Sequence, residues 1–98
     1  MAMRTLVIVP ARDEASSIVP MLWRIRRDSP EVAVLVVDAG SCDGTGDLAV
    51  AAGRTLGDVF VLRRARDDAG EAYTAGIDWA RERDYAVVAY RDLLDRAA

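Results

Sequence analysis

The chain has 98 residues, the size of one small domain, and 52% of them are hydrophobic, which is typical of a globular protein. Sixteen acidic residues outnumber thirteen arginines, and a net charge of −3 without a basic cluster argues against nucleic acid or an anionic membrane as a partner. The chain lacks histidine and lysine and has a single cysteine, Cys42, which excludes histidine-based triads, Schiff-base lysines and an internal disulfide.

The first predicted elements are a strand and a helix. Thr5–Val9 (TLVIV) is a continuous hydrophobic run that Pro10 stops, as expected of a strand buried on both faces. Ser16 or Ser17 can cap the helix that follows, and Pro20 must lie in its first turn, where a missing N–H costs least. The hydrophobic residues at helical spacing are Ile18, Met21, Leu22 and Ile25.

The same alternation continues through the middle of the chain. Val32–Val37 (VAVLVV) predicts a second buried strand, and Asp58–Leu62 (DVFVL) predicts a third. Between them lies a helix that Asp43 can cap. We expect its buried face to consist of Leu48, Ala51 and Ala52.

A third helix and a fourth strand complete the series. The helix is predicted over Ala69–Arg83, with a stripe of small residues that lets its backbone lie close to a sheet: Ala72, Gly76 and Ala80. Tyr85–Tyr90 (YAVVAY) predicts the fourth strand, and the last eight residues (RDLLDRAA) predict a short helical tail.

Alternating strands and helices with hydrophobic strands indicate an α/β fold. We predict a three-layer, Rossmann-like parallel sheet of about four strands flanked by helices. Ligands of such sheets bind at the carboxyl ends of the strands. Two polar loops follow strands at that edge, "PARDEASS" and "DAGSCDGT", and both carry carboxylates.

These loops also allow a structural interpretation, and other nucleotide or phosphate sites must be compared with them. Proline, aspartate and glycine are ordinary turn and cap residues, so the loops can be purely structural. A dinucleotide site would need G-x-G-x-x-G after the first strand, where this chain has no glycine. A P-loop or a phosphoacceptor receiver site would need a lysine, which is absent.

Three segments resemble the amino-terminal half of a family-2 glycosyltransferase with the GT-A fold, of the dolichol-phosphate mannosyltransferase type. They are "VIVPARDEASSI", "VLVVDAGSCDGTGDLA" and "AGEAYTAGIDWARERDYAVV", in the family's order and spacing. The resemblance implies that residues 1–98 form one GT-A-like half-domain that binds a nucleotide-diphospho-sugar, and that the chain is truncated.

The resemblance also implies where the donor binds. Its positions fall on Pro10, Ala11, Arg12, Glu14, Val37, Asp38 and Ala39. Pro10 and Glu14 match a loop that contacts the nucleoside, and Glu14 suits the ribose hydroxyls. Asp38 matches the first carboxylate of the family's aspartate pair. Arg12 replaces a usual tyrosine and either meets a phosphate or only solvates the rim.

The sequence departs from the family pattern at two positions with chemical consequences. Ala39 stands where the second aspartate usually reads the base, and an alanine side chain cannot accept a hydrogen bond from it. The family's D-x-D motif, which implies Mg²⁺ or Mn²⁺, is reduced to Asp92, with Leu94 at the second carboxylate position and Arg91 alongside. A single carboxylate binds a hard cation poorly, so we expect at most a weak, degraded metal site.

Two functional hypotheses therefore remain. One is a glycosyltransferase-like donor domain, truncated or degenerate, with little independent activity. The other is a non-enzymatic α/β module that binds a nucleotide or a protein partner. The sequence identifies neither catalytic residues nor the sugar, base or acceptor.

Location and assembly complete the expectations. No hydrophobic run approaches the ~20 residues of a membrane span, the amino terminus lacks a signal-peptide pattern, and a cytoplasmic location fits the single cysteine. The fourth strand offers a hydrophobic edge without proline or inward charge, so we expect a homodimer through this edge. The competing arrangement is a monomer in which the tail covers the edge.

Overall fold

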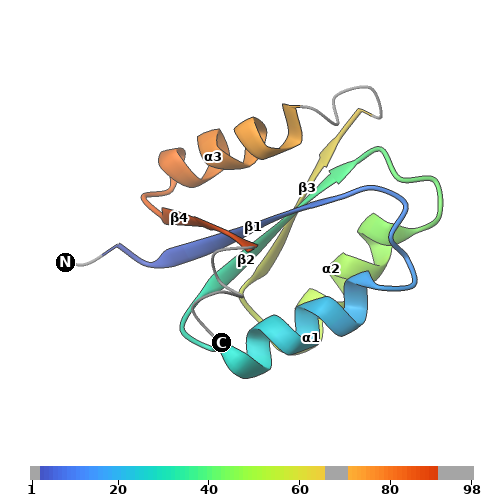
Figure 1. The fold of residues 1–98 in the computed structure, drawn as a ribbon, viewed down its shortest axis with the longest axis horizontal. Helices are drawn as coiled ribbons and strands as arrows, with labels where there is room; N and C mark the ends of the chain where they lie inside the picture. Colours follow the sequence, from blue (N-terminus) through green and yellow to red (C-terminus); the bar gives the residue numbers. More distant parts are fainter. Residues whose placement is uncertain (1–2, 66–70, 91–98) are drawn as a thin grey trace.

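The computed structural model describes residues 3–65 and 71–90, and it has the predicted alternation of strands and helices (Figure 1). Three segments lie outside the described residues: 1–2, 66–70 and 91–98. The predicted tail, Asp92 and the expected start of the third helix belong to them. The elements in chain order are β1 (Thr5–Ala11), α1 (Ile18–Asp28), β2 (Ala33–Ala39), α2 (Thr45–Leu56), β3 (Val59–Arg64), α3 (Ala72–Glu82) and β4 (Ala86–Ala89).

The four strands form one parallel sheet in the order β3-β2-β1-β4. β1 and β2 are the central strands, and every residue of β2 is buried. Their sequences are continuously hydrophobic because a central strand of a parallel sheet is covered on both faces. The order places β4 beside β1, with Thr5 opposite Ala86 and Ile8 opposite Ala89.

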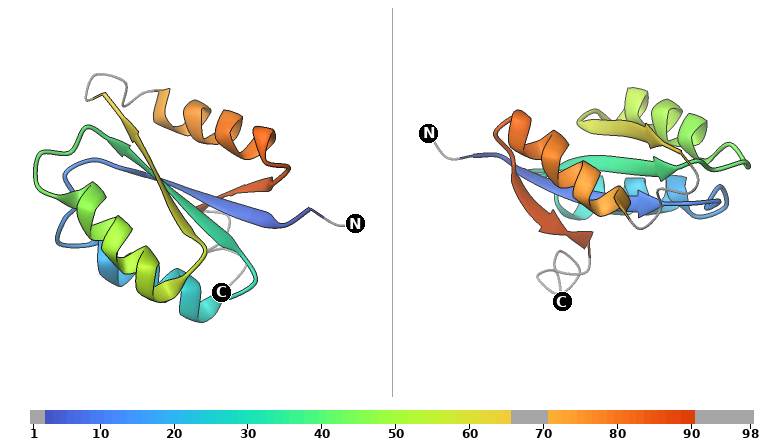
Figure 2. Two further views of the ribbon diagram at one scale, coloured as in Figure 1. Left: turned by 180° about the vertical axis from the view of Figure 1, so that it is seen from behind. Right: turned by 90° about the horizontal axis from the view of Figure 1, so that it is seen from above.

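Helices cover both faces of the sheet, which confirms the three-layer α/β fold. In Figure 2, α1 and α2 lie together on one face and α3 lies on the other. Alternate residues of β1 accordingly enter different cores: Val7 and Val9 face α1 and α2, and Leu6 and Ile8 face α3. Within the described residues, none of the helices is long and hydrophobic enough to span a membrane.

The small-residue stripe of α3 is confirmed as its buried face. Ala72, Gly76 and Ala80 are buried against the sheet. A methyl group added to Gly76 would lie 3.0 Å from Ile8 Cγ2 and 3.2 Å from Val37 Cγ2. The helix backbone therefore lies so close to β1 and β2 that a side chain larger than that of alanine does not fit at this position.

Two details of the prediction were wrong. Pro10 does not end the first strand, because β1 continues through it to Ala11. Pro10 lies beyond Ile8, the last β1 residue paired with β4, and a proline is tolerated where ladder pairing on one side has stopped. In α2, the buried alanines are Ala49 and Ala52, whereas Leu48 is 39% exposed. Because Leu48 was assigned to the buried face, the predicted face of α2 was rotated by about one residue. The helix lies close to the sheet, so its buried positions hold small residues instead.

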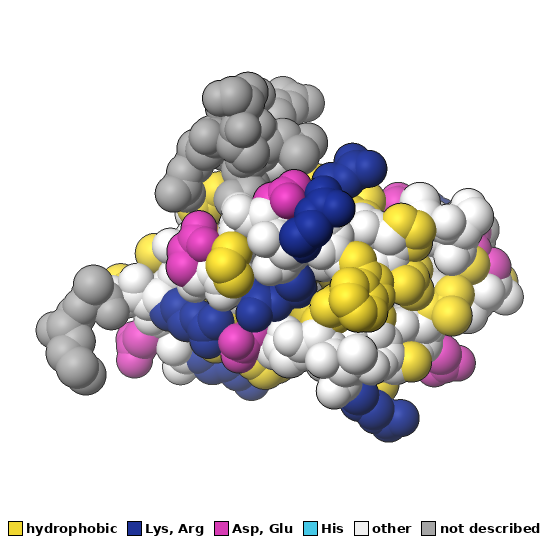
Figure 3. Space-filling view, turned by 90° about the horizontal axis from the view of Figure 1, so that it is seen from below, with side chains coloured by type: hydrophobic (Ala, Val, Ile, Leu, Met, Phe, Trp, Pro, Cys, Tyr) yellow, Lys and Arg dark blue, Asp and Glu magenta, His cyan; other side chains and the backbone are white. Residues whose placement is uncertain are grey.

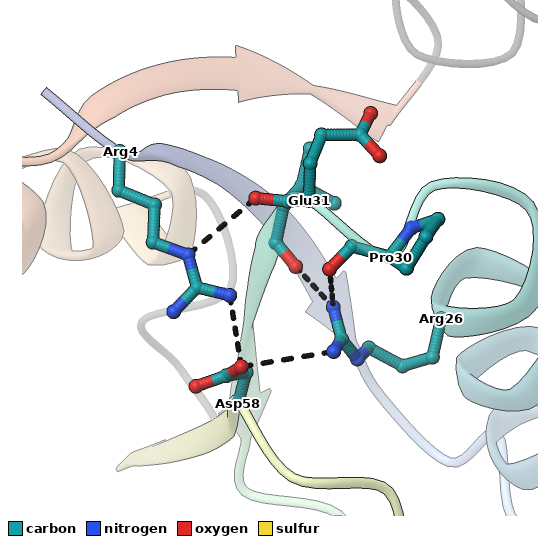
Figure 4. Close-up of polar contacts among 6 residues, drawn as sticks. Arg4, Arg26, Pro30, Glu31 and Asp58 are labelled. Carbon is teal, nitrogen blue, oxygen red and sulfur yellow. Dashed lines mark hydrogen bonds and ion pairs between the residues drawn. The ribbon is translucent and has the colours of Figure 1, made fainter. Parts of the chain in front are cut away.

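The amino edge of the sheet is held by an ionic cluster (Figure 4). Arg4 Nη2 donates to Asp58 Oδ2 at 2.8 Å, and Arg26 Nη2 lies 3.6 Å from the same oxygen. Arg26 also donates to the carbonyls of Pro30 and Val32. The hydrogen bond from Arg4 lowers the pKa of Asp58 and raises that of Arg4. These contacts join the segments that enter β1, β2 and β3, so this edge serves the fold.

Candidate functional site at the carboxyl edge

The opposite edge of the sheet brings the predicted site residues together. Pro10 lies opposite Val37 and Ala11 lies opposite Asp38 in the β1–β2 ladder. The two polar loops therefore leave the sheet side by side, as the parallel arrangement requires. Pro10 and Arg12 are exposed and Glu14 is partly buried, whereas the side chains of the remaining predicted residues are buried: Ala11, Val37, Asp38 and Ala39.

The two loops are joined by reciprocal hydrogen bonds. The Asp13 N–H donates to Ser41 Oγ at 2.9 Å, and the Cys42 N–H donates to Asp13 Oδ1 at 2.8 Å. Asp13 has a φ of 51°, and Gly40 has a φ of 69°. Left-handed backbone in both loops turns the chain sharply, so the loops contact each other directly above the sheet edge.

A second pair of contacts ties the first loop to the start of α2. The Glu14 N–H donates to Thr45 Oγ1 at 2.9 Å, and the Ala15 N–H donates to Asp43 Oδ2 at 3.0 Å. Thr45 is fully buried, and its hydroxyl donates in turn to Asp43 Oδ1. The position of Glu14 is therefore fixed by the helix that follows the second loop.

The cap residue of α2 is Gly44 and not Asp43 as predicted, but the Asp43 side chain, one residue earlier, still binds the start of the helix. Its Oδ1 accepts the N–H of Thr45, the first residue of α2, at 3.1 Å. Hydrogen bonds from the Thr45 hydroxyl and the Ala15 N–H lower the pKa of the Asp43 carboxyl. Gly44, with a φ of 88°, supplies the left-handed turn before the helix. Gly44 and Asp43 therefore have structural roles: they shape the loop and bind the start of α2.

Asp38 is the most buried carboxylate of the site, with 4% of its surface exposed. Its Oδ1 accepts the Ser41 N–H at 3.1 Å. Its Oδ2 faces the first turn of α2, where any side chain on Gly46 would collide with it. Asp38 therefore holds the second loop through the Ser41 N–H, and the absence of a side chain on Gly46 leaves room for the Asp38 carboxylate.

Arg63 is a site residue that sequence reasoning missed. It lies opposite Asp38 in the β2–β3 ladder, and its guanidinium also lies over Gly46. Its Nη2 donates to Asp47 Oδ1 at 2.6 Å, and this bond, with smaller contributions from the charges of Asp47 and Asp38, raises the pKa of Arg63. The sequence held one signal for it: Arg63 follows the hydrophobic run of the third predicted strand. The carboxyl ends of parallel strands lie at the same edge of a sheet, so this residue could have been placed near Asp38.

The described residues do not fit a metal ion. Among them, no three carboxylate or thiol side chains come together in a way that would hold a cation. Asp92, the one metal position implied by the sequence, lies outside the described part of the chain. We therefore derive no step through a metal at this edge.

The sequence matches known proteins over most of its length. The family model "Glycosyl transferase family 2" matches residues 6–93. An undecaprenyl-phosphate mannosyltransferase from Micrococcus luteus is 44% identical over 91 residues, which cover 92% of this chain and 37% of that protein. A polyprenol monophosphomannose synthase from Mycolicibacterium smegmatis is 41% identical over 91 residues, covering 91% of this chain and 34% of that protein.

A solved structure agrees with the sequence matches. It is the mannosyltransferase PcManGT from Pyrobaculum calidifontis, in complex with GDP-Man and Mn²⁺. The superposition gives a TM-score of 0.71 at 27% identity and covers 82% of this chain and 25% of that one. The present chain thus spans about a third of the length of the two curated relatives. On the family match and these identities, the chain belongs to glycosyl transferase family 2.

Proposed function

We propose that the chain binds a nucleotide-diphospho-sugar at the carboxyl edge of β1 and β2, as the donor-binding part of a mannosyltransferase-type protein. The observation that carries this proposal is the pair of cross-linked loops, which holds Glu14 beside the exposed Pro10 and Arg12. The relatives support it, since they are mannosyltransferases, and the solved neighbour holds GDP-Man.

The geometry suggests a division of roles within the proposed site. Glu14 is partly buried and its backbone is fixed by Thr45, so its carboxylate is suited to accept hydrogen bonds from ribose hydroxyls. Pro10 offers an exposed hydrophobic ring to the nucleoside, and the exposed Arg12 is placed for a phosphate. Ala11, Val37 and Ala39 form the floor, and Asp38 holds the second loop in position.

We further propose that the chain alone has little transferase activity. Ala39 gives the base no side-chain acceptor, and the sequence retains only Asp92 where the family pattern has two carboxylates. The alternative function is a non-enzymatic module that binds a nucleotide or a protein through the same loops. A cytoplasmic location fits either function and remains a prediction.

A nucleotide titration tests the donor site. Adding GDP-mannose or UDP-glucose to the ¹⁵N-labelled chain should shift the backbone amide signals of Glu14 and Asp38, with weak affinity. Because the described residues gather no metal ligands, Mg²⁺ should change that affinity by less than about twofold. Glu14→Gln should weaken binding about tenfold, since it removes a charged acceptor of hydroxyl hydrogen bonds.

Glu31→Gln is the matched control for this titration. Glu31 is exposed at the amino edge, and Arg4 Nε donates to its backbone carbonyl and not to its side chain, so the substitution should leave binding unchanged. Absence of any shift at millimolar nucleotide-sugar would refute the donor site and favour the non-enzymatic module.

We also propose a homodimer through the outer edge of β4. Among the described strands, β4 pairs with β1 and ends the sheet on that side. The Ala86 N–H donates to the Arg4 carbonyl at 2.9 Å, so by alternation the N–H groups of Val87 and Ala89 point to the outer edge. Val88 is unsuitable for a charge substitution, because it packs against the core on the α1–α2 face.

Hydrogen exchange combined with sedimentation tests the dimer. If two β4 edges pair, exchange at Val87 and Ala89 should slow as protein concentration rises, while exchange at Ala86 stays slow throughout. Sedimentation velocity should show a dimer over the same concentrations. A monomer at high micromolar concentration excludes the dimer, and slow exchange in that monomer would mean that another part of the chain covers the edge.

A further inference from the structure

Within the described residues, the sheet ends at β3 on one side and at β4 on the other (Figure 2). The first four residues of β3 are hydrophobic, and all four are only partly buried. The Val34 N–H of β2 donates to the Asp58 carbonyl at 2.9 Å. By alternation along β3, the N–H groups of Val59 and Val61 therefore point away from β2, toward the outer edge. An added strand can pair with these groups.

A groove of about 450 Å³ lies between β3 and α3. The helix packs over β1 and β2, where Gly76 approaches Ile8 and Val37, and it leaves the adjacent side of β3 partly exposed. Leu62 and Trp79, both partly buried, give the groove a hydrophobic wall. Because the groove adjoins the outer edge of β3, alternate side chains of an added strand would enter it.

The α3 side of this groove is acidic. All three acidic residues between positions 71 and 82 line it, whereas Arg81, the only arginine of α3, does not. Glu82 lies 3.5 Å from Arg83 in an ion pair. The side chains of Glu71 and Asp78 make no hydrogen bond or ion pair with any residue that the structure describes. Two exposed carboxylates in the groove thus await positive partners.

Two arginines also line the groove, and they belong to its two ends. Arg83 follows α3, lies over the Trp79 ring at 4.2 Å and donates to the Trp79 carbonyl at 3.0 Å. Arg64 is the last residue of β3. Asp78 lies between these ends, so the middle of the groove keeps its negative charge.

The side of the molecule on which α1 lies differs in this respect. Figure 3 shows arginines there among acidic and hydrophobic side chains. Arg26 pairs with Asp58 at 3.6 Å, and Arg27 pairs with Asp28 at 2.9 Å. Charges on that side are therefore matched within the fold, whereas the two carboxylates beside β3 are not.

We propose that β3 binds an extended, basic segment of a partner protein by strand addition, with cationic side chains in the groove. Hydrogen bonds to an exposed strand edge supply affinity, and pockets beside the edge select alternate side chains. Arginine or lysine fits the groove, because its aliphatic stem can lie along Leu62 and Trp79 while its charge reaches Asp78. The surface includes none of the residues proposed for the donor site, so either function can fail alone.

A capped six-residue peptide that alternates arginine and valine tests strand addition to the 98-residue chain. It should shift the amide signals of Val59 and Val61 in the ¹⁵N-labelled chain and slow their hydrogen exchange at least about fivefold. Binding should weaken as salt rises. A glutamate–valine peptide of the same length should bind at least about tenfold more weakly. The arginine–valine peptide with every backbone N–H methylated cannot pair with the strand and should not bind.

Removal of the two carboxylates tests the groove. The double variant Glu71→Gln/Asp78→Asn should weaken binding of the arginine–valine peptide at least about fivefold, because both unpaired charges are lost. Asp28→Asn/Glu31→Gln is the matched control: it removes the same charge at exposed positions away from the groove and should weaken binding less than about twofold. Thermal unfolding of both variants checks that the fold is retained.

Four results would overturn strand addition at β3. They are no shift with the arginine–valine peptide, undiminished binding of its methylated form, equal weakening by the two double variants, and shifts confined to Val87 and Ala89. The last result would move the pairing to the β4 edge. Slow exchange at Val59 and Val61 in a dimer without peptide, detected by sedimentation, would assign the β3 edge to a second copy of the chain and also overturn the proposal.

Discussion

Replacing Gly76 with leucine is expected to lower the free energy of unfolding by about 3 kcal/mol. A single added methyl group would already lie 3.0 Å and 3.1 Å from two carbon atoms of Ile8, a β1 residue whose side chain is fully buried in the core beneath α3. A leucine side chain must therefore push α3 away from β1 and β2. Urea unfolding followed by circular dichroism measures the loss.

Two further variants test whether crowding between α3 and the sheet causes the loss of stability in Gly76→Leu. Gly76→Ala should change stability by less than about 1 kcal/mol, because the higher helix propensity of alanine offsets mild crowding. Thr74→Leu adds a large side chain to the exposed side of the same helix and should change stability by less than about 0.5 kcal/mol. Equal stability of the Gly76→Leu variant and the wild type would contradict the close approach of α3.

The sheet could be predicted because its sequence signals are local and consistent. The hydrophobic runs of β1 and β2 reflect burial on both faces, and the alternation with helices leaves a parallel sheet as the simple solution. The buried face of α3 could also be predicted from the sequence, because a helix that lies close to a sheet buries its smallest residues. Strand ends were less predictable, since polar Asp38 and proline at position 10 hide the continuing ladder.

The contacts within the candidate site could not be predicted, because they join residues far apart in the sequence. Asp13 reads as an ordinary loop residue, yet it contacts Ser41 and Cys42, 28 and 29 residues away. In the sequence, Thr45 is only the last residue of a glycine-rich loop, yet its hydroxyl accepts a hydrogen bond from the Glu14 N–H. Arg63 joins the site only through strand register. Sequence identified the residue types at this edge, and the fold determined their partners.

Replacing Thr45 with valine is expected to lower the free energy of unfolding by about 2 kcal/mol. Valine matches the shape of threonine at a fully buried position but removes the hydroxyl that accepts the Glu14 N–H. The first loop then loses one of its two hydrogen bonds to the start of α2, so the Glu14 amide should exchange with solvent faster. Urea unfolding and amide hydrogen exchange measure the two effects.

The same substitution should weaken nucleotide-sugar binding and alter a titration. The hydrogen bond from the Thr45 hydroxyl is the largest cause that lowers the pKa of Asp43, so that pKa should rise toward its ordinary value in the Thr45→Val variant. Thr55→Val, at an exposed position of α2, is the control and should leave stability, titration and binding unchanged. If Thr45→Val binds GDP-mannose as well as the wild type does, the tie between the loops is structural only. Weaker binding, with the fold intact by circular dichroism, would show that the position of Glu14 depends on a hydroxyl 31 residues away.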